Sequence, residues 1–168
     1  GLRGGFQLWI SLPAGDKMTP PRYQEFAAGA IPRVTPADGV TVSVIAGRFA
    51  GVDGPVQGIA TAPLYLDVTL AAGAAAACPL PAAAAALVYV FEGSVAIAGT
   101  TLEAPVAAPL TGPGGAALQA GAAGARLLLL AATPLDEPVV RYGPFVMNTR
   151  EEILQAFEDF RAGRLGAV

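Results

Sequence analysis

The sequence contains no histidine and only one cysteine, and each scarcity limits its chemistry. Histidine is the most common metal ligand in proteins and the usual general base near neutral pH. The chain therefore cannot build a Ser-His or Cys-His catalytic pair, or a histidine-rich metal site, from its own residues. Cys78 has no second cysteine with which to form an internal disulfide, which fits a reducing, cytoplasmic location. We interpret Cys78 as a small buried or loop thiol rather than a nucleophile.

Charged residues are also scarce, at 14% of the chain. The 10 lysines and arginines form no basic cluster and are outnumbered by 13 acidic residues, so the electrostatic footprint of a nucleic-acid-binding protein is absent from the sequence. The longest unbroken apolar run, residues 82–91, is shorter than the ~18–20 residues that cross a bilayer. We therefore expect no direct nucleic-acid partner and no membrane span.

Apolar residues make up 54% of the sequence, and many of them alternate with polar residues in short runs bounded by glycine or proline. Alternation with a period of two is typical of β-strands. It predicts strands at residues 6–12, 40–46, 64–70, 87–91, 94–98 and 126–131. Many short strands at close spacing predict a mainly β protein, an antiparallel β-barrel of the cupin or jelly-roll type with a short C-terminal α-helix.

The predicted helix spans about residues 149–162. Thr149 and Glu152 have the spacing of a capping box, in which each side chain accepts a hydrogen bond from a free backbone amide at the helix start. Gly163 is placed to end the helix. Apolar residues recur between them at helical spacing, namely Ile153, Ala156, Phe157 and Phe160. We interpret this as a packing helix, and we expect residues 6–12 to cover its apolar stripe.

Residues 71–86 and 104–125 are rich in alanine. Alanine has a high helix propensity, but prolines and glycines interrupt both runs. We therefore predict strands and loops in which alanine has replaced larger residues, and a barrel core that is weakened there.

Within these runs the chain keeps the glycines of a cupin metal motif and none of its ligands. In the pattern G(x)5HxH(x)3–4E(x)6G, the outer glycines are Gly73 and Gly93. The two histidine positions are Pro79 and Pro81, and the glutamate position is Ala86. Proline and alanine have no side-chain ligand atom.

The second cupin motif, G(x)5PxG(x)2H(x)3N, has lost its ligands in the same way. Pro113 and Gly115 keep the turn, whereas the histidine position is Leu118 and the asparagine position is Ala122. We predict no catalytic, cofactor-binding or metal-binding residue in this chain.

Four other polar residues are weaker candidates. Glu92 could bind a hard cation through its carboxylate, but beside Gly93 we interpret it as a turn residue. Arg141 and Tyr142 are interpreted as residues that hold a domain interface, and Asn148 as a helix cap.

Longer segments resemble the pirin family. Residues 5–13 (GFQLWISLP) and 16–24 (DKMTPPRYQ) resemble the place in pirins where the first cupin domain ends, and residues 134–149 (PLDEPVVRYGPFVMNT) resemble the pirin C-terminal signature. Shorter similar segments lie between them, at residues 45–47, 65–68 and 89–93. The resemblance spans nearly the whole chain.

The resemblance implies a bicupin, with two facing barrels that a C-terminal helix helps to join. Residues 1–36 would be a remnant of the N-terminal cupin domain plus a linker, and residues 37–168 the C-terminal cupin domain. In the family, iron is held in the N-terminal barrel by three histidines and one glutamate. Those ligands lie upstream of the position equivalent to Gly1, so none carries over to this sequence, and any iron is expected in the N-terminal half.

The resemblance also implies a function for the parent protein. Bacterial pirins are often quercetin 2,3-dioxygenases, so the parent would be an iron-dependent oxidoreductase of this kind that binds a flavonoid-like molecule only when intact, with this chain inactive alone. The alternative is a structural or protein-interaction module without catalysis, like the transcriptional co-regulators among animal members. In both cases the expected partner is the N-terminal cupin domain or a second copy of this chain.

Overall fold

The structure, a computed structural model, describes residues 5–111 and 114–165. The chain divides into two compact units. One unit is the continuous segment Gln24–Pro134, and the other combines Gly1–Tyr23 with Leu135–Val168. The predicted domain boundary after residue 36 stays a prediction. No helix within the described ranges is long and apolar enough to cross a membrane.

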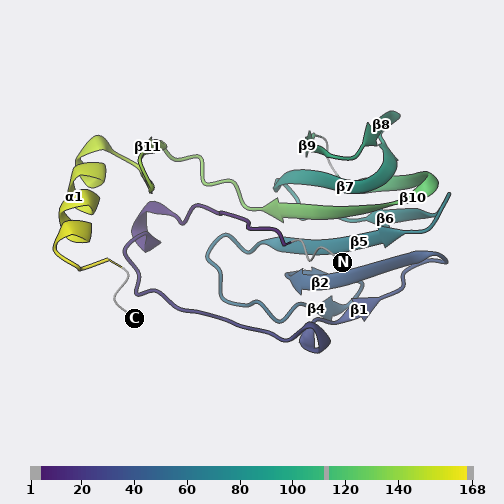
Figure 1. The fold of residues 1–168 in the computed structure, drawn as a ribbon, viewed down its shortest axis with the longest axis horizontal. Helices are drawn as coiled ribbons and strands as arrows, with labels where there is room; N and C mark the ends of the chain where they lie inside the picture. Colours follow the sequence, from purple (N-terminus) through teal and green to yellow (C-terminus); the bar gives the residue numbers. More distant parts are fainter. Residues whose placement is uncertain (1–4, 112–113, 166–168) are drawn as a thin grey trace. The chain divides into compact units, whose positions relative to one another are not determined.

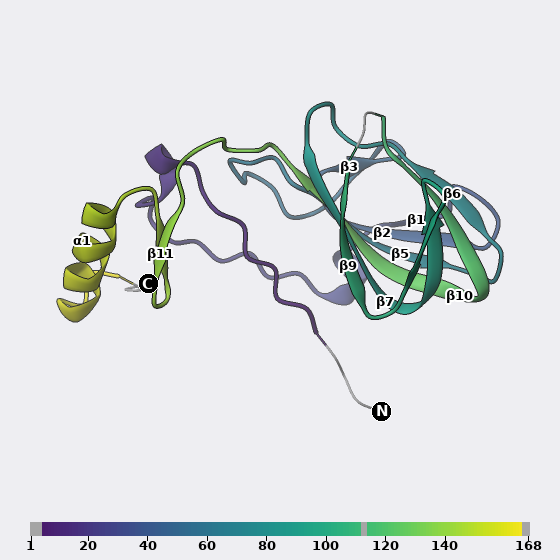
Figure 2. The same cartoon turned by 90° about the horizontal axis from the view of Figure 1, so that it is seen from above.

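The unit Gln24–Pro134 is an antiparallel β-barrel, seen end-on in Figure 2. Its eight-stranded sheet has the order β1-β2-β5-β10-β7-β8, and in addition β6 pairs with β10 and β9 with β7 (Figure 1). The strands are β1 (Arg33–Val34), β2 (Val40–Ala46), β5 (Leu64–Leu70), β6 (Ala75–Cys78), β7 (Ala85–Ile97), β8 (Thr100–Glu103), β9 (Val106–Leu110) and β10 (Ala116–Ala132). A small hairpin is formed by β3 (Arg48–Phe49) and β4 (Val52–Asp53). The predicted mainly β, antiparallel barrel is confirmed.

The predicted strands agree best where the alternation is strict. The strands predicted at residues 40–46 and 64–70 are β2 and β5, with the same bounds. Those predicted at 87–91 and 94–98 form the single strand β7, in which Gly93 adopts a left-handed φ of 68° at an irregularity in the pairing with β10. The strand predicted at 126–131 is the second half of β10.

Inward-facing residues of neighbouring strands form the core of the barrel. β2 and β5 bury every second side chain, because successive side chains of a strand point to opposite faces, whereas β10 also buries consecutive residues in its second half. The largest fully buried side chains include Leu66, Leu118, Leu127 and Leu129. Valines of β2, β5 and β7 complete this layer, namely Val40, Val42, Val44, Val68, Val88, Val90 and Val95.

The second unit contains the hairpin of β11 (Val140–Tyr142) and β12 (Phe145–Met147), followed by α1 (Arg150–Arg161). The capping box is confirmed: the backbone N–H of Glu152 donates to Thr149 Oγ1 at 3.2 Å, and the Glu152 carboxylate accepts from the backbone N–H of Thr149 at 2.9 Å. Gly163 adopts a left-handed φ of 68° just beyond the helix, as predicted for a stop.

The apolar stripe of α1 packs against this hairpin. The ring of Phe157 lies 5.7 Å from the ring of Tyr142 and 4.9 Å from that of Phe145, both in edge-on arrangements. These ring contacts come from the hairpin, and the expected cover by residues 6–12 stays a prediction. The hairpin precedes the helix directly in the sequence, and this short connection favours local packing over packing with a distant segment.

Residues 5–13 form no strand, which corrects the prediction for residues 6–12. Their alternation is that of a strand, but a strand needs a neighbour to satisfy its backbone donors and acceptors. A short 3₁₀ turn, η1 (Ala14–Asp16), follows. The Glu137 carboxylate accepts from the backbone N–H of Ala14 at 2.9 Å, and this hydrogen bond joins the segment to the chain before the hairpin.

The irregularity at Gly93 yields a prediction that separates backbone strain from steric overlap. Gly73 and Gly93 have nearly equal φ angles of 67° and 68°, but a Cβ at Gly73 would meet nothing within 4 Å, whereas a Cβ at Gly93 would overlap the carbonyl oxygen of Gly124. Gly73→Ala should cost about 1–2 kcal/mol of stability from the left-handed conformation alone. Gly93→Ala should cost about 2–5 kcal/mol, because overpacking adds about 1–3 kcal/mol.

Urea unfolding of both variants, followed by circular dichroism, tests this difference. Equal losses for the two variants would mean that the backbone at Gly93 moves away from Gly124 at no cost.

Candidate functional site

The two outer glycines of the cupin motif lie where the chain changes direction. Gly73 is in the turn between β5 and β6, where its carbonyl accepts from the side chain of Gln119 at 2.7 Å, and Gly93 is at the irregularity in β7. Both have positive φ angles. Gly73 therefore lies in a turn between two strands, whereas Gly93 lies within one strand.

The motif positions between and beyond these glycines do not come together. Leu118 is 2% exposed in the core, and Ala86 is half-buried against it. Pro79 and Pro81, in contrast, are exposed in the segment after β6, and Ala122 is also exposed. Spacing alone therefore misplaced the two histidine positions, because the residues of β6 that face inward are Ala76 and Cys78.

In the second motif, Pro113 lies outside the described residues. Gly115 has a φ of 128°, and a Cβ there would lie 2.6 Å from the carbonyl oxygen of Cys78. Only glycine therefore fits this close approach to the end of β6.

The interior of the barrel does not fit a metal ion. Its side chains are almost all aliphatic, and the one with a ligand atom among the described core residues is Cys78, which is 1% exposed. Burial raises the pKa of the Cys78 thiol from 9.0 to about 11. The thiol therefore stays protonated at neutral pH, whereas metals bind the thiolate. In the described ranges no three His, Cys, Asp or Glu residues are grouped in a way that could hold a metal.

A charged cluster lies instead on the outside of the barrel, around Arg126. Its guanidinium is 3.1 Å from the Glu92 carboxylate and 3.9 Å from that of Asp67, and it lies 4.9 Å from the centre of the Phe91 ring. Glu92 is a strand residue of β7 and not a turn residue, which corrects its interpretation. Because these side chains are substantially exposed, the ion pairs contribute little to stability.

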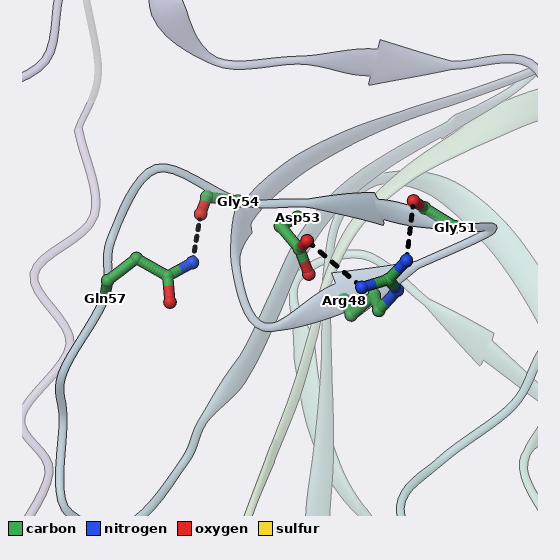
Figure 3. A network of polar contacts seen from close by, with 5 residues as sticks. All are labelled: Arg48, Gly51, Asp53, Gly54 and Gln57. Atoms are coloured by element: carbon green, nitrogen blue, oxygen red, sulfur yellow. Dashed lines mark hydrogen bonds and ion pairs between the residues drawn. The ribbon is translucent and has the colours of Figure 1, made fainter.

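Figure 3 shows a second polar cluster, at the hairpin of β3 and β4. Arg48 donates to Asp53 at 3.2 Å and to the carbonyl of Gly51 at 3.3 Å, and the side chain of Gln57 donates to the carbonyl of Gly54 at 2.6 Å. A Cβ at Gly54 would lie 2.6 Å from the Ile45 backbone. These contacts fix the hairpin close to β2 and leave no converging acid and base for catalysis.

The residues of the C-terminal signature hold the second unit together. The Asn148 side-chain amide donates to the Glu137 carboxylate at 2.8 Å and to the carbonyl of Pro138 at 3.0 Å. The helix cap is Thr149, so the interpretation of Asn148 as the cap is wrong by one residue. Tyr142 packs against the helix through Phe157, and Arg141 is exposed on the same hairpin. Whether Arg141 and Tyr142 also serve a domain interface stays a prediction.

The outer face of the central strands is a feature that the sequence analysis overlooked. Leu127 and Leu129 point into the core, so Leu128 and Leu130 point outward, yet Leu128 is only 6% exposed. Leu128 lies beside Asp67 and Tyr89, and Leu130 beside Tyr65 and Leu87. We call Tyr65, Leu87, Tyr89, Leu128 and Leu130 the outer sheet face. The four consecutive leucines of residues 127–130 were the available signal, because a continuous apolar run is typical of a strand buried on both faces.

Burial of Cys78 predicts a measurable pH dependence. Its pKa is raised on folding, so its contribution to stability is complete below about pH 9 and is lost as the pH rises from 9.0 to about 11. The chain should lose up to about 2–3 kcal/mol over this window relative to Cys78→Ala. Burial and the nearby Asp67 also raise the pKa of Tyr65. Because Tyr65 is present in both proteins, its effect on stability cancels in the difference.

Urea unfolding at a series of pH values measures this difference, and a thiol-specific reagent should react with the chain only after unfolding. Rapid labelling of the folded chain at pH 7.5 would contradict the burial of Cys78.

Comparison with known proteins places these observations in a family. Residues 65–166 match the family model of the pirin C-terminal cupin domain. The chain is 44% identical over 165 residues to a pirin-like protein of Caulobacter vibrioides, which covers 98% of this chain and 59% of that protein. It is 40% identical over 167 residues to pirin of Mus musculus, which covers 96% of this chain and 57% of that protein.

A solved structure agrees with this assignment. The crystal structure of quercetin 2,3-dioxygenase from Acinetobacter baumannii, at 1.88 Å resolution, matches with a TM-score of 0.84 and 35% sequence identity, over 95% of this chain and 56% of that chain. The chain thus spans between 56% and 59% of the length of these three relatives. It belongs to the pirin family and carries the pirin C-terminal cupin domain.

Proposed function

We propose that this chain is the metal-free cupin half of a quercetin 2,3-dioxygenase-like protein, in which an N-terminal cupin domain carries the iron and binds the flavonoid-like substrate. The observation that carries the proposal is the extended segment of residues 5–13. Most of its apolar side chains are solvent-exposed and Leu12 is half-buried, although their order in the sequence is that of a buried strand.

The exposure of this segment has a large energetic consequence. Trp9 is 74% exposed, Phe6 50%, and Leu8 and Ile10 39% each. Burying one such side chain is worth about 1.5–3 kcal/mol, so these four together represent a large fraction of the ~5–15 kcal/mol by which a domain is stable. An apolar surface of this kind favours a partner that covers it. A segment that is already extended is suited to join another β-sheet as an added strand.

The outer sheet face supports the same proposal from the other unit. In an antiparallel sheet with one face on the core and the other in water, outward positions are normally polar. Here the outward positions include the outer sheet face, of which all residues but Leu128 are half-buried, beside the charged pair of Asp67 and Arg126. Such a face is suited to a further protein layer. The chain would then help to form one wall of the groove between two cupin domains.

The interior of the barrel supports a role other than direct catalysis. Activation of oxygen requires a redox metal with open coordination positions, and no residue set among the described positions fits one. The chain would therefore contribute shape and stability to the parent protein, while the reaction takes place in the other cupin domain. The same exposed segment also favours the second candidate, a protein-interaction module without catalysis, and only measured turnover separates the two.

Reconstitution from two parts tests the proposal. The portion of the Caulobacter vibrioides relative that precedes its aligned region would be produced as a separate chain, loaded with iron and mixed with this chain. We expect a complex, and iron-dependent consumption of oxygen with quercetin only in the mixture. Ile10→Glu should weaken the complex by tenfold or more, because it buries a charge in the interface.

Gln7→Glu is the matched control, because it adds the same charge at a polar position three residues earlier in the same segment. It should change the affinity by less than about twofold. A complex without turnover would favour the protein-interaction module. Without the partner, we expect this chain to self-associate as its concentration rises, and analytical ultracentrifugation measures this. A stable monomer that does not bind the added portion would contradict both candidates.

A further inference from the structure

One end of the barrel is hollow, in contrast to the close packing of its centre. A cavity of about 340 Å³ lies between β8, β9, the end of β7 and the beginning of β10. Figure 1 shows β8 and β9 together beside β7 at this part of the barrel. The cavity wall contains Leu80, Ile97, Leu102, Ala108, Leu110 and Ala116.

Small inward-facing residues explain why this end is not filled. On β9 the inward positions are Val106, Ala108 and Leu110, which pack against the core while the residues between them are exposed. Ala116 is 4% exposed at the base of the cavity. Alanine at positions 108 and 116 removes volume that larger side chains provide elsewhere in the barrel, and a barrel of about eight strands is just wide enough either to be filled or to enclose one small ligand.

The wall of the cavity is chemically selective. No charged side chain is among the described residues that line it, and its polar side chains are the hydroxyls of Thr100 and Thr111, both of which are exposed residues. A charged ligand would lose its hydration there without gaining a partner, and this is costly. The volume lies within the range of ~300–1,000 Å³ that is typical of small-molecule pockets, which are also mostly apolar with few polar groups.

We propose that this cavity binds one small, uncharged, apolar molecule of one to three aromatic rings. The site is independent of the iron-dependent function proposed above, because it lies in the cupin domain whose motif positions carry no metal ligand. Side chains of the barrel core form the base of the site. The exposed hydroxyls of Thr100 and Thr111 could hydrogen-bond to a hydroxyl or carbonyl group of the ligand.

Fluorescence titration with N-phenyl-1-naphthylamine, a neutral probe that joins a naphthyl and a phenyl group, tests the site in the full chain. We expect saturable binding of one probe molecule per chain. The anionic analogue 1-anilinonaphthalene-8-sulfonate, which has the same rings and a sulfonate, should bind at least tenfold more weakly. Equal affinity for the two probes would overturn the uncharged class of ligand.

Ala108→Leu should weaken binding of the neutral probe by tenfold or more, because its side chain fills the cavity from β9. The matched control is Ala107→Leu, which adds the same atoms at an exposed position of the same strand and should leave the affinity within about twofold. Leu102→Phe, which narrows the cavity from β8, gives a second blocking variant if Ala108→Leu melts early by circular dichroism. Trp9→Ser should leave binding unchanged, which excludes the exposed segment as the binding site.

Retained binding in whichever blocking variants remain folded would overturn the proposal. Loss of binding in both Ala107→Leu and Ala108→Leu would do so too, because the effect would then not belong to the cavity. Absence of saturable binding to the unmodified chain would equally reject it.

Discussion

The pairing of β10 with its neighbours is the interaction on which the barrel depends. This strand of 17 residues pairs with β5, β6 and β7, so it connects strands that are otherwise far apart in the fold. One long strand can serve three neighbours only if it bends, and the register shift between Ala120 and Ala125 opposite Gly93 provides the bend. A Cβ at Gly93 would overlap the carbonyl oxygen of Gly124, and a Cβ at Gly124 would lie 2.6 Å from the carbonyl oxygen of Leu70, so neither position tolerates a side chain. The strand pairing therefore determines the shape of the barrel interior, and the core side chains fill that interior.

This dependence on backbone pairing explains how a cupin fold persists without metal ligands. Strand ladders are made of N–H and C=O groups that every residue except proline supplies, and the core requires only that inward positions be apolar. Leu118, which the motif spacing places at a histidine position, meets that requirement better than histidine would, since it buries no polar atom. An apolar residue at such a position therefore leaves the stability of the barrel unaffected or improved. The glycines remain because their role concerns the backbone.

The sequence predicted the elements whose signals are local. The strict alternation of β2 and β5 and the capping box of α1 each identify an element from fewer than a dozen residues. The prediction failed where the signal is weak or distant. Alanine has no clear inward or outward preference, so β6, β9 and the first half of β10 could not be located within the alanine-rich runs. The partner of α1 and the outward direction of Pro79 depend on tertiary packing, which motif spacing does not contain.

The alanine-rich runs have different consequences in different parts of the barrel. Ala120, Ala125 and Ala131 of β10 are buried members of the core. At Ala108 and Ala116, where β8 contributes Thr100 and Leu102 to the cavity wall, the same small side chain leaves space. Closely packed interiors are energetically favoured, so an unfilled apolar cavity lowers stability by itself. A ligand that fills it restores the lost contacts, and the chain would then be more stable when the site is occupied.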